Sequence, residues 1–200
     1  HGDFEGALSL LLAHNPLPGL TGRLCYHPCQ TQCVRRKIDR MIPIQELERF
    51  LGDLATDISI EKGDKTCLRV TFIGSGPLGL SCAFYLGCQG YEVTILDPFQ
   101  KAGGGLAALP PEKIEPRVLS HEIDRLIRLG GIRYEANVAI DSNDLGQATS
   151  KADLVILDPT GLPADFCQAA GTVACDPFDD AAVPGGIVSV QLPKILTPFK

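Results

Sequence analysis

A glycine-rich turn between an expected strand and an expected helix constrains this chain more than any other feature. Gly74, Gly76 and Gly79 have the spacing G-x-G-x-x-G and directly follow the apolar run CLRVTFI (67–73). A helical pattern begins inside the motif, and Asp97 ends the next apolar run, 18 residues after Gly79. This order of strand, glycine turn, helix, strand and acidic residue is typical of a dinucleotide-binding domain.

Each part of the turn has a physical role. Gly74 permits the tight turn, Gly76 lets the backbone approach a diphosphate, and Gly79 lets helix and strand pack closely. The N–H groups that open the helix attract phosphate. Asp97 can accept hydrogen bonds from ribose hydroxyls and disfavours a 2′-phosphate, which argues against NADP in this loop. The residues expected along the cofactor are Gly74, Ser75, Gly76, Pro77, Gly79 and Asp97.

The motif leaves alternatives open. It does not separate FAD from NAD, and a degenerate domain could keep the fold without binding a nucleotide. A second glycine-rich stretch, KAGGGL (101–106), follows the second expected strand, and its Gly104, Gly105 and Leu106 are candidate cofactor contacts. An ordinary flexible loop is the alternative for that stretch.

Strands and helices alternate through the rest of this region, which predicts an α/β fold with a doubly wound, Rossmann-like parallel sheet. We assign residues 67–200 to this domain, although the pattern weakens after residue 159, where IVSVQL could form one more strand. The expected helices are 77–90 and 117–130, and the expected strands are 67–73, 92–97, 132–140 and 153–158.

Residues 1–60 have a different texture and predict a small α-helical domain. Helices are expected at 5–14 and 42–55, and the polar segment 61–66 looks like a linker. Between the two helices, Cys25, Cys29 and Cys33 lie at four-residue intervals.

Three thiols are too few for a four-ligand metal site, but clustered cysteines favour metal or redox chemistry over a disulfide framework here. Soft thiolates suit an iron–sulfur cluster, and zinc with His27 as a ligand is the second possibility. Cys82 and Cys88 fall on the helix after the glycine turn and are expected in or near the core.

Composition excludes several function classes. The net charge of −6 and the pI near 5.2 argue against a nucleic-acid binder. No apolar run reaches the length of a membrane span, and no secretory signal is visible, so we expect a cytoplasmic location. The chain begins with His1 and contains a single Met, which suggests a processed chain or an excised fragment.

Three segments in this order resemble one known family: NPLPGLTGRLCYHPCQTQCVRR with IPIQELERFLGDLA, then VTFIGSGPLGLSCAFYLGCQGYEVTILDPFQKAGGGL, then RVLSHEIDRLIRLGG. They are similar to the small (beta) subunit of glutamate synthase and to related NAD(P)H-dependent flavin/iron–sulfur oxidoreductases, including the N-terminal part of dihydropyrimidine dehydrogenase. The resemblance covers roughly residues 3–157. It implies that electrons pass from NAD(P)H to FAD and then through two [4Fe–4S] clusters to a partner subunit or domain.

The resemblance also implies a ligand set. Cys25 and Cys29 would bind one cluster, Cys33 the other, and Glu48 stands where the family can use a carboxylate or amide ligand. The remaining ligands would come from an upstream four-cysteine motif, so the set in this chain is expected to be incomplete.

The sequence departs from the family in three places. Residues 107–116 lack an aromatic and a Gly-Ile-Pro segment, Asp158 and Pro159 replace small residues, and no second glycine motif for NAD(P)H follows. No catalytic side chain stands out, because the cofactors carry the chemistry in such proteins. We therefore expect one part of an oxidoreductase that is not self-sufficient; the alternative is a degenerate scaffold or docking module of an electron-transfer complex.

Overall fold

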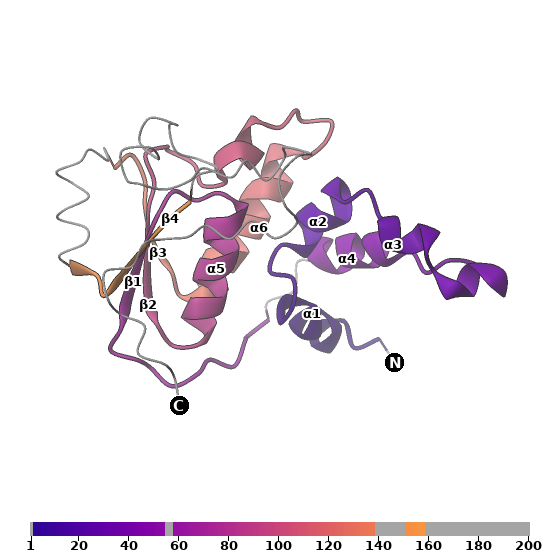
Figure 1. Cartoon of the computed structure of the whole chain (residues 1–200), viewed down its shortest axis with the longest axis horizontal. Coiled ribbons are helices and arrows are strands. Elements are labelled where there is room, and N and C mark those ends of the chain that lie inside the picture. The colour runs from indigo at the N-terminus through magenta and orange to yellow at the C-terminus, as the bar shows by residue number, and fades with distance from the viewer. Residues whose placement is uncertain (1, 55–57, 139–150, 159–200) are drawn as a thin grey trace.

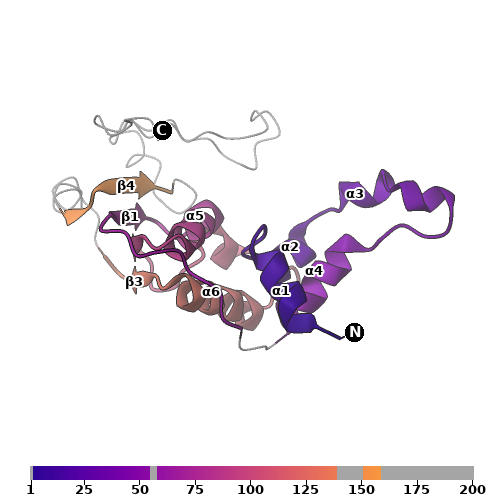
Figure 2. The same ribbon diagram turned by 90° about the horizontal axis from the view of Figure 1, so that it is seen from below.

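The computed structural model of the chain describes residues 2–54, 58–138 and 151–158. These residues form a parallel sheet, a pair of helices on one face of the sheet, and a group of N-terminal helices beyond that pair (Figures 1 and 2). None of the helices in these ranges has the length and apolarity that crossing a membrane requires.

The sheet is parallel throughout, as the alternation of strands and helices predicts. Its strands lie in the order β3-β2-β1-β4, so β1 is central and pairs with both β2 and β4. Phe72 is fully buried and lies opposite Ile95 on one side and Ile156 on the other. The strands are β1 (Arg69–Ile73), β2 (Glu92–Leu96), β3 (Arg133–Glu135) and β4 (Leu154–Leu157).

Helices α5 (Pro77–Cys88) and α6 (Pro116–Gly130) connect the first three strands and cover the same face of the sheet (Figure 2). Right-handed crossovers that step in one direction along a sheet produce this placement. The two helices meet closely, since a Cβ on Gly87 would lie 2.2 Å from the carbonyl oxygen of Gly130. Helices on both faces, which a doubly wound sheet needs, stay a prediction, and IVSVQL lies outside the described residues.

The N-terminal region contains two short α-helices and one 3-10 turn more than the sequence predicts. The expected helices are confirmed as α1 (Phe4–Leu12) and α4 (Ile44–Asp53), and the cysteine segment adds α3 (Pro28–Thr31) and a 3-10 turn, η1 (Val34–Lys37). Helix α2 (Pro18–Leu24) lies between the two expected helices and was not predicted. Pro18 is the first residue of α2. Proline is favoured at this position, because the N–H that it lacks would have no partner inside the helix.

Helices α2 and α4 cross at glycines. A Cβ on Gly22 would lie 2.5 Å from the nitrogen of Arg49, and a Cβ on Gly52 would lie 2.3 Å from the nitrogen of Gly19. This crossing uses one side of α4 and leaves much of its apolar stripe uncovered: Leu47 is 52% exposed and Phe50 is 50% exposed.

A buried ion pair on α6 holds the N-terminal helices against the sheet domain. Glu122 is 1% exposed, and its Oε2 accepts hydrogen bonds from the N–H groups of Gly19, at 2.9 Å, and Leu20, at 3.2 Å. Arg125 pairs with Glu122 and donates to the carbonyl oxygen of Gly52 at 2.9 Å. The carboxylate thus meets the positive start of α2 and the guanidinium meets the negative end of α4.

The same burial changes the titration of Glu122. Loss of solvent raises the pKa of Glu122 to about 7, and Arg125, Leu20 and Gly19 oppose this rise. A folded-state pKa above the unfolded value of about 4.3 means that the folded chain binds the proton more tightly. The stabilisation from this group is therefore complete at low pH and is lost as the pH rises through about 7.

We predict that Arg125→Met lowers the free energy of unfolding by about 3–5 kcal/mol at pH 8, because it leaves a buried carboxylate without its partner. The loss should shrink as the pH falls to 5, because protonation removes the charge of Glu122. Urea unfolding followed by circular dichroism at both pH values measures this. Arg117→Met, at an exposed position on the same helix, should change stability by less than about 0.5 kcal/mol. A loss for Arg125→Met that is equal at the two pH values would contradict the prediction.

Candidate functional site

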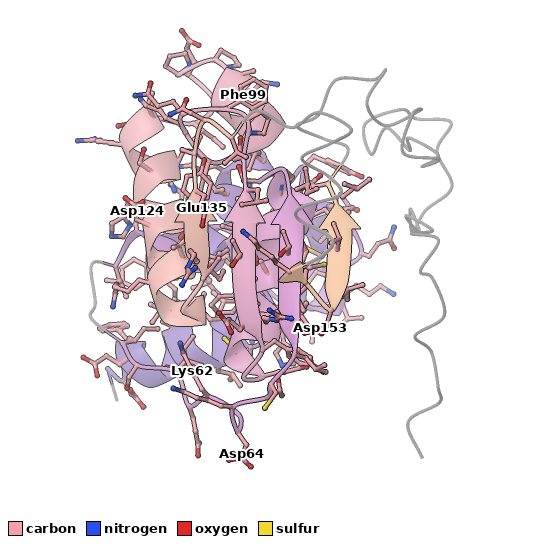
Figure 3. The ribbon with its side chains drawn as sticks, turned by 90° about the vertical axis from the view of Figure 1, so that its left-hand side faces the viewer. Lys62, Asp64, Phe99, Asp124, Glu135 and Asp153 are labelled. Atoms are coloured by element: carbon pink, nitrogen blue, oxygen red, sulfur yellow. The ribbon has the colours of Figure 1, made fainter. Side chains whose placement is uncertain are left out.

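The two glycine-rich loops meet at the carboxyl edge of the sheet. Gly74 follows β1 with a φ of 91°, and Gly103 has a φ of 126°, both in the region that favours glycine. The N–H of Gly103 lies 3.0 Å from both the carbonyl oxygen and the hydroxyl of Ser75. Figure 3 shows this edge, where Phe99 is labelled, opposite the edge that carries Asp153. The structure thus places the two glycine-rich loops side by side.

Asp97 ends β2 at this edge, as predicted, but it faces the first loop. It is 1% exposed; its Oδ2 accepts from the hydroxyl of Ser75 and its Oδ1 accepts from the N–H of Phe99 at 2.7 Å. Tyr134 on β3 lies beside this pair: burial raises the pKa of Tyr134 to about 12, Asp97 adds to the rise, and Ser75 opposes it. The sequence analysis did not single out Tyr134, because its position opposite Ile95 depends on the strand register.

The expected residues of the second loop separate into different environments. Gly104, Gly105 and Leu106 lie in a 3-10 turn, η2 (Gly104–Ala108). Leu106 is 7% exposed and belongs to the hydrophobic core, whereas Gly105 is exposed. Their contact with a cofactor stays a prediction.

Asp158 directly follows β4 and reaches the start of α5. Its N–H donates to the carbonyl of Ile73 at 2.8 Å, and its Oδ2 accepts from the N–H of Gly79 at 2.7 Å. The side chain is 1% exposed. The remaining motif residues, Gly76 and Pro77, form the N-cap and the first residue of α5.

The cysteine segment projects away from the sheet and ends in an exposed arm (Figures 1 and 2). Cys25 and Cys29 are exposed and Cys33 is half-buried. The N–H of His27 lies 3.3 Å from the sulfur of Cys25, and the side-chain amide of Gln45 donates to the carbonyl of Cys25 at 2.7 Å. Gln45 thus positions this segment, a role that sequence reasoning missed because nothing in the pattern pairs residue 45 with residue 25.

Glu48, the expected carboxylate ligand, is half-buried on α4, where its Oε2 accepts from the hydroxyl of Thr21 at 3.2 Å. Across the described ranges, no three His, Cys, Asp or Glu side chains are grouped closely enough to hold a metal ion. The three thiols and Glu48 therefore fit an iron–sulfur site in their chemistry, but not as a closed set within this part of the chain.

Cys33 is set apart by its electrostatics. Backbone hydrogen bonding from Ile42, followed by that from Arg35, lowers the pKa of the Cys33 thiol against the effect of desolvation. Arg35 also pairs with Asp39, so the basic run after Cys33 is partly neutralised within its own turn. A thiol that is readily deprotonated is a better metal ligand.

Two other cysteines differ in both place and electrostatics. Cys82 is exposed and Cys88 is half-buried, so the prediction that both lie in or near the core was wrong for Cys82. Partial desolvation, with a contribution from Asp158, raises the pKa of the Cys82 thiol. The helix periodicity placed Cys82 near the core without showing that its side of α5 stays open.

Comparison with known proteins agrees with this arrangement. Residues 1–60 match the family described as dihydropyrimidine dehydrogenase domain II, 4Fe-4S cluster. The chain is 33% identical over 165 residues to the NADPH-Fe(3+) oxidoreductase subunit beta of Geobacter sulfurreducens, covering 78% of this chain and 24% of that protein. It is 34% identical over 219 residues to the NAD-dependent dihydropyrimidine dehydrogenase subunit PreT of Escherichia coli, covering 97% of this chain and 53% of that protein.

The chain is thus similar to subunits of NAD(P)H-dependent oxidoreductases, and its N-terminal region is of a 4Fe-4S cluster type. Its first 60 residues are of the dihydropyrimidine dehydrogenase domain II type. The chain spans about a quarter to a half of the length of these two relatives. The resemblance seen in the sequence is therefore confirmed at the level of the family.

We predict that alkylation of Cys33 by iodoacetamide reaches half of its maximal rate at a lower pH than alkylation of Cys82, because the thiolate is the reactive form. Mass spectrometry of the labelled peptides over a pH series measures both profiles in one sample. In urea the two profiles should converge, since the folded environment produces the difference. Equal midpoints in the folded chain would show that the backbone around Cys33 does not stabilise its thiolate.

Proposed function

We propose that this chain is the part of an electron-transferring oxidoreductase that holds the ADP portion of FAD and contributes thiolates to [4Fe–4S] clusters. The observation that carries the proposal is the meeting of the 74–79 loop, the 101–106 loop and Asp97 at one edge of a parallel sheet, in a chain whose first 60 residues are of an iron–sulfur type. Electrons would pass from NAD(P)H through FAD to the clusters, as in the glutamate synthase small subunit that the motifs resemble.

The flavin part of the proposal assigns roles to residues of both loops. The backbone at Gly74, Ser75 and Gly76 would cradle the diphosphate, and Asp97 would exchange its bond to Ser75 for a ribose hydroxyl. When bound, FAD supplies the step between a two-electron hydride donor and one-electron acceptors. The doubly wound sheet and the division into residues 1–60 and 67–200 belong to the same proposal.

The cluster part assigns Cys25 and Cys29 to one cluster and Cys33 to another. Exposure of Cys25 and Cys29 and the lowered pKa of Cys33 support thiolate ligation. Glu48 could join only by leaving Thr21. The other ligands and the NAD(P)H site would come from outside the described residues.

A partner subunit is the expected electron acceptor or donor. Apolar side chains in the cysteine segment (residues 25–38) are unusually exposed, with Tyr26 at 84%, Val34 at 76% and Ile38 at 83%. Exposed apolar surface of this kind is typical of a protein interface. A cytoplasmic location is part of the proposal, since clustered thiols persist in reducing compartments.

A second candidate function is a scaffold that keeps the fold and binds no flavin. Two carboxylates favour it: Asp97 is bonded to the first loop and Asp158 to the start of α5. In this reading the chain would position other cofactor-bearing parts of an electron-transfer complex.

We predict that the purified chain binds FAD, seen as quenching of flavin fluorescence during titration, and that Gly76→Val weakens binding at least about tenfold. Gly76 has a φ of −67°, which valine adopts, so the substitution adds bulk beside the diphosphate without straining the backbone. An unchanged melting temperature would confirm that the variant is folded. A folded wild-type chain that does not bind FAD would favour the scaffold.

We predict that anaerobic reconstitution with iron and sulfide loads the chain through the cysteine segment. Replacing Cys25, Cys29 and Cys33 together by serine should remove most of the bound iron, because hydroxyls are poor ligands for a thiolate cluster. Cys67→Ser, at an exposed thiol outside the segment, is the matched control and should retain it. Iron content by colorimetric assay and the visible spectrum measure both; equal iron in all variants would refute the assignment.

A further inference from the structure

Asp158 occupies the point in the sheet where a dinucleotide would meet the protein. The strand order β3-β2-β1-β4 changes direction between β1 and β4, and ligands of such sheets bind at the carboxyl ends of the two strands beside that change. Asp158 follows β4 at this point, and its backbone is fixed by the bond to Ile73. Its carboxylate is therefore placed at the expected cofactor crevice by the sheet itself.

The carboxylate uses a donor that a diphosphate would need. The first turn of an α-helix leaves four N–H positions without a partner inside the helix, here residues 76–79, and Pro77 has no N–H. The N–H of Leu80 already donates to the carbonyl of Gly76. Among the remaining donors, Asp158 takes the N–H of Gly79 at 2.7 Å.

Gly79 is fitted to this carboxylate. A Cβ on Gly79 would lie 2.7 Å from Oδ2 of Asp158 and 3.1 Å from the carbonyl oxygen of Gly74. The third glycine of the motif thus admits the acidic side chain as well as the close packing of α5 on β1. The contact is made between two buried partners and is not an exposed, incidental one.

Charge adds to the competition. Asp97, bonded to Ser75, is the second buried carboxylate at this edge of the sheet. A diphosphate entering beside two carboxylates meets like charge in a region shielded from water, where repulsion is strong. A bond between a helix N–H and a carboxylate is also among the stronger hydrogen bonds.

We propose that Asp158 is a built-in competitor of the cofactor diphosphate: its carboxylate holds the N–H of Gly79 and must turn away before a dinucleotide can use the first turn of α5. The inference rests on the proposed flavin site and assigns to Asp158 the control of the cofactor affinity of that site. Because the backbone of Asp158 is held in the sheet, release needs rotation of one side chain and no movement of the strand. Whatever draws that carboxylate away raises the affinity for the cofactor.

The test compares the full chain with Asp158→Ala and Asp158→Asn, using ADP and adenosine as probes in isothermal titration calorimetry. We expect Asp158→Ala to bind ADP at least about tenfold more tightly than the wild type, because it frees a donor and removes a charge. Asp158→Asn removes the charge but keeps an acceptor, so its gain should be smaller. Adenosine, which lacks the diphosphate, should bind all three chains within about twofold of one another. Asp124→Asn, an exposed carboxylate on α6, is the control for net charge.

Hydrogen exchange gives a readout that needs no cofactor. The Gly79 amide should exchange slowly in the wild type and faster in Asp158→Ala, and ADP should restore its protection. Equal ADP affinity in the wild type and both variants would overturn the inference while leaving the flavin site intact. If neither ADP nor FAD binds any variant, although all are folded, the inference and the proposed function both fail. Equal gains for ADP and adenosine would also overturn the role of the diphosphate.

Discussion

The ion pair between Glu122 and Arg125 is the interaction on which the arrangement of this chain depends. It lies on α6, inside the sheet domain, yet each partner bonds to a helix end in the N-terminal region more than 70 positions earlier in the sequence. Buried charges are costly unless they are fully paired. Here each charge meets its partner and an oppositely polarised helix end, so part of the cost of desolvation is offset in one relative orientation of the two regions.

The carboxyl edge of the sheet is organised in the same way, by carboxylates that accept from backbone N–H groups. Asp97 joins the first loop to the turn after β2, and Asp158 joins β4 to the start of α5. These bonds preserve the loop geometry of a dinucleotide site while using some of its donors. The same edge is therefore compatible with a flavin site and with a scaffold that binds no flavin. The two differ in whether the loop donors bind a cofactor or the carboxylates of Asp97 and Asp158.

Periodicity and motif spacing predicted the parallel sheet, α1, α4, α5 and α6, because these follow from local sequence. Helix α2 was missed because proline at a helix start and proline in a loop look alike in sequence. The burial of Glu122 and Arg125 could have been predicted, since they lie on the same side of α6 as the apolar residues Leu119, Ile123 and Leu126. The bonds of Asp158 and Gln45 depend on long-range placement, which one sequence does not reveal.

Helix α2 has a consequence for the position of the cysteine segment. Its seven residues are clamped by Glu122 at one end, and the other end delivers Cys25. At about 1.5 Å per residue, helix α2 is roughly 10 Å long. One added residue within α2 would swing Cys25 by about 100° around the helix axis while leaving the clamp untouched. The direction and reach of the cysteine segment thus depend on the length of a single short helix.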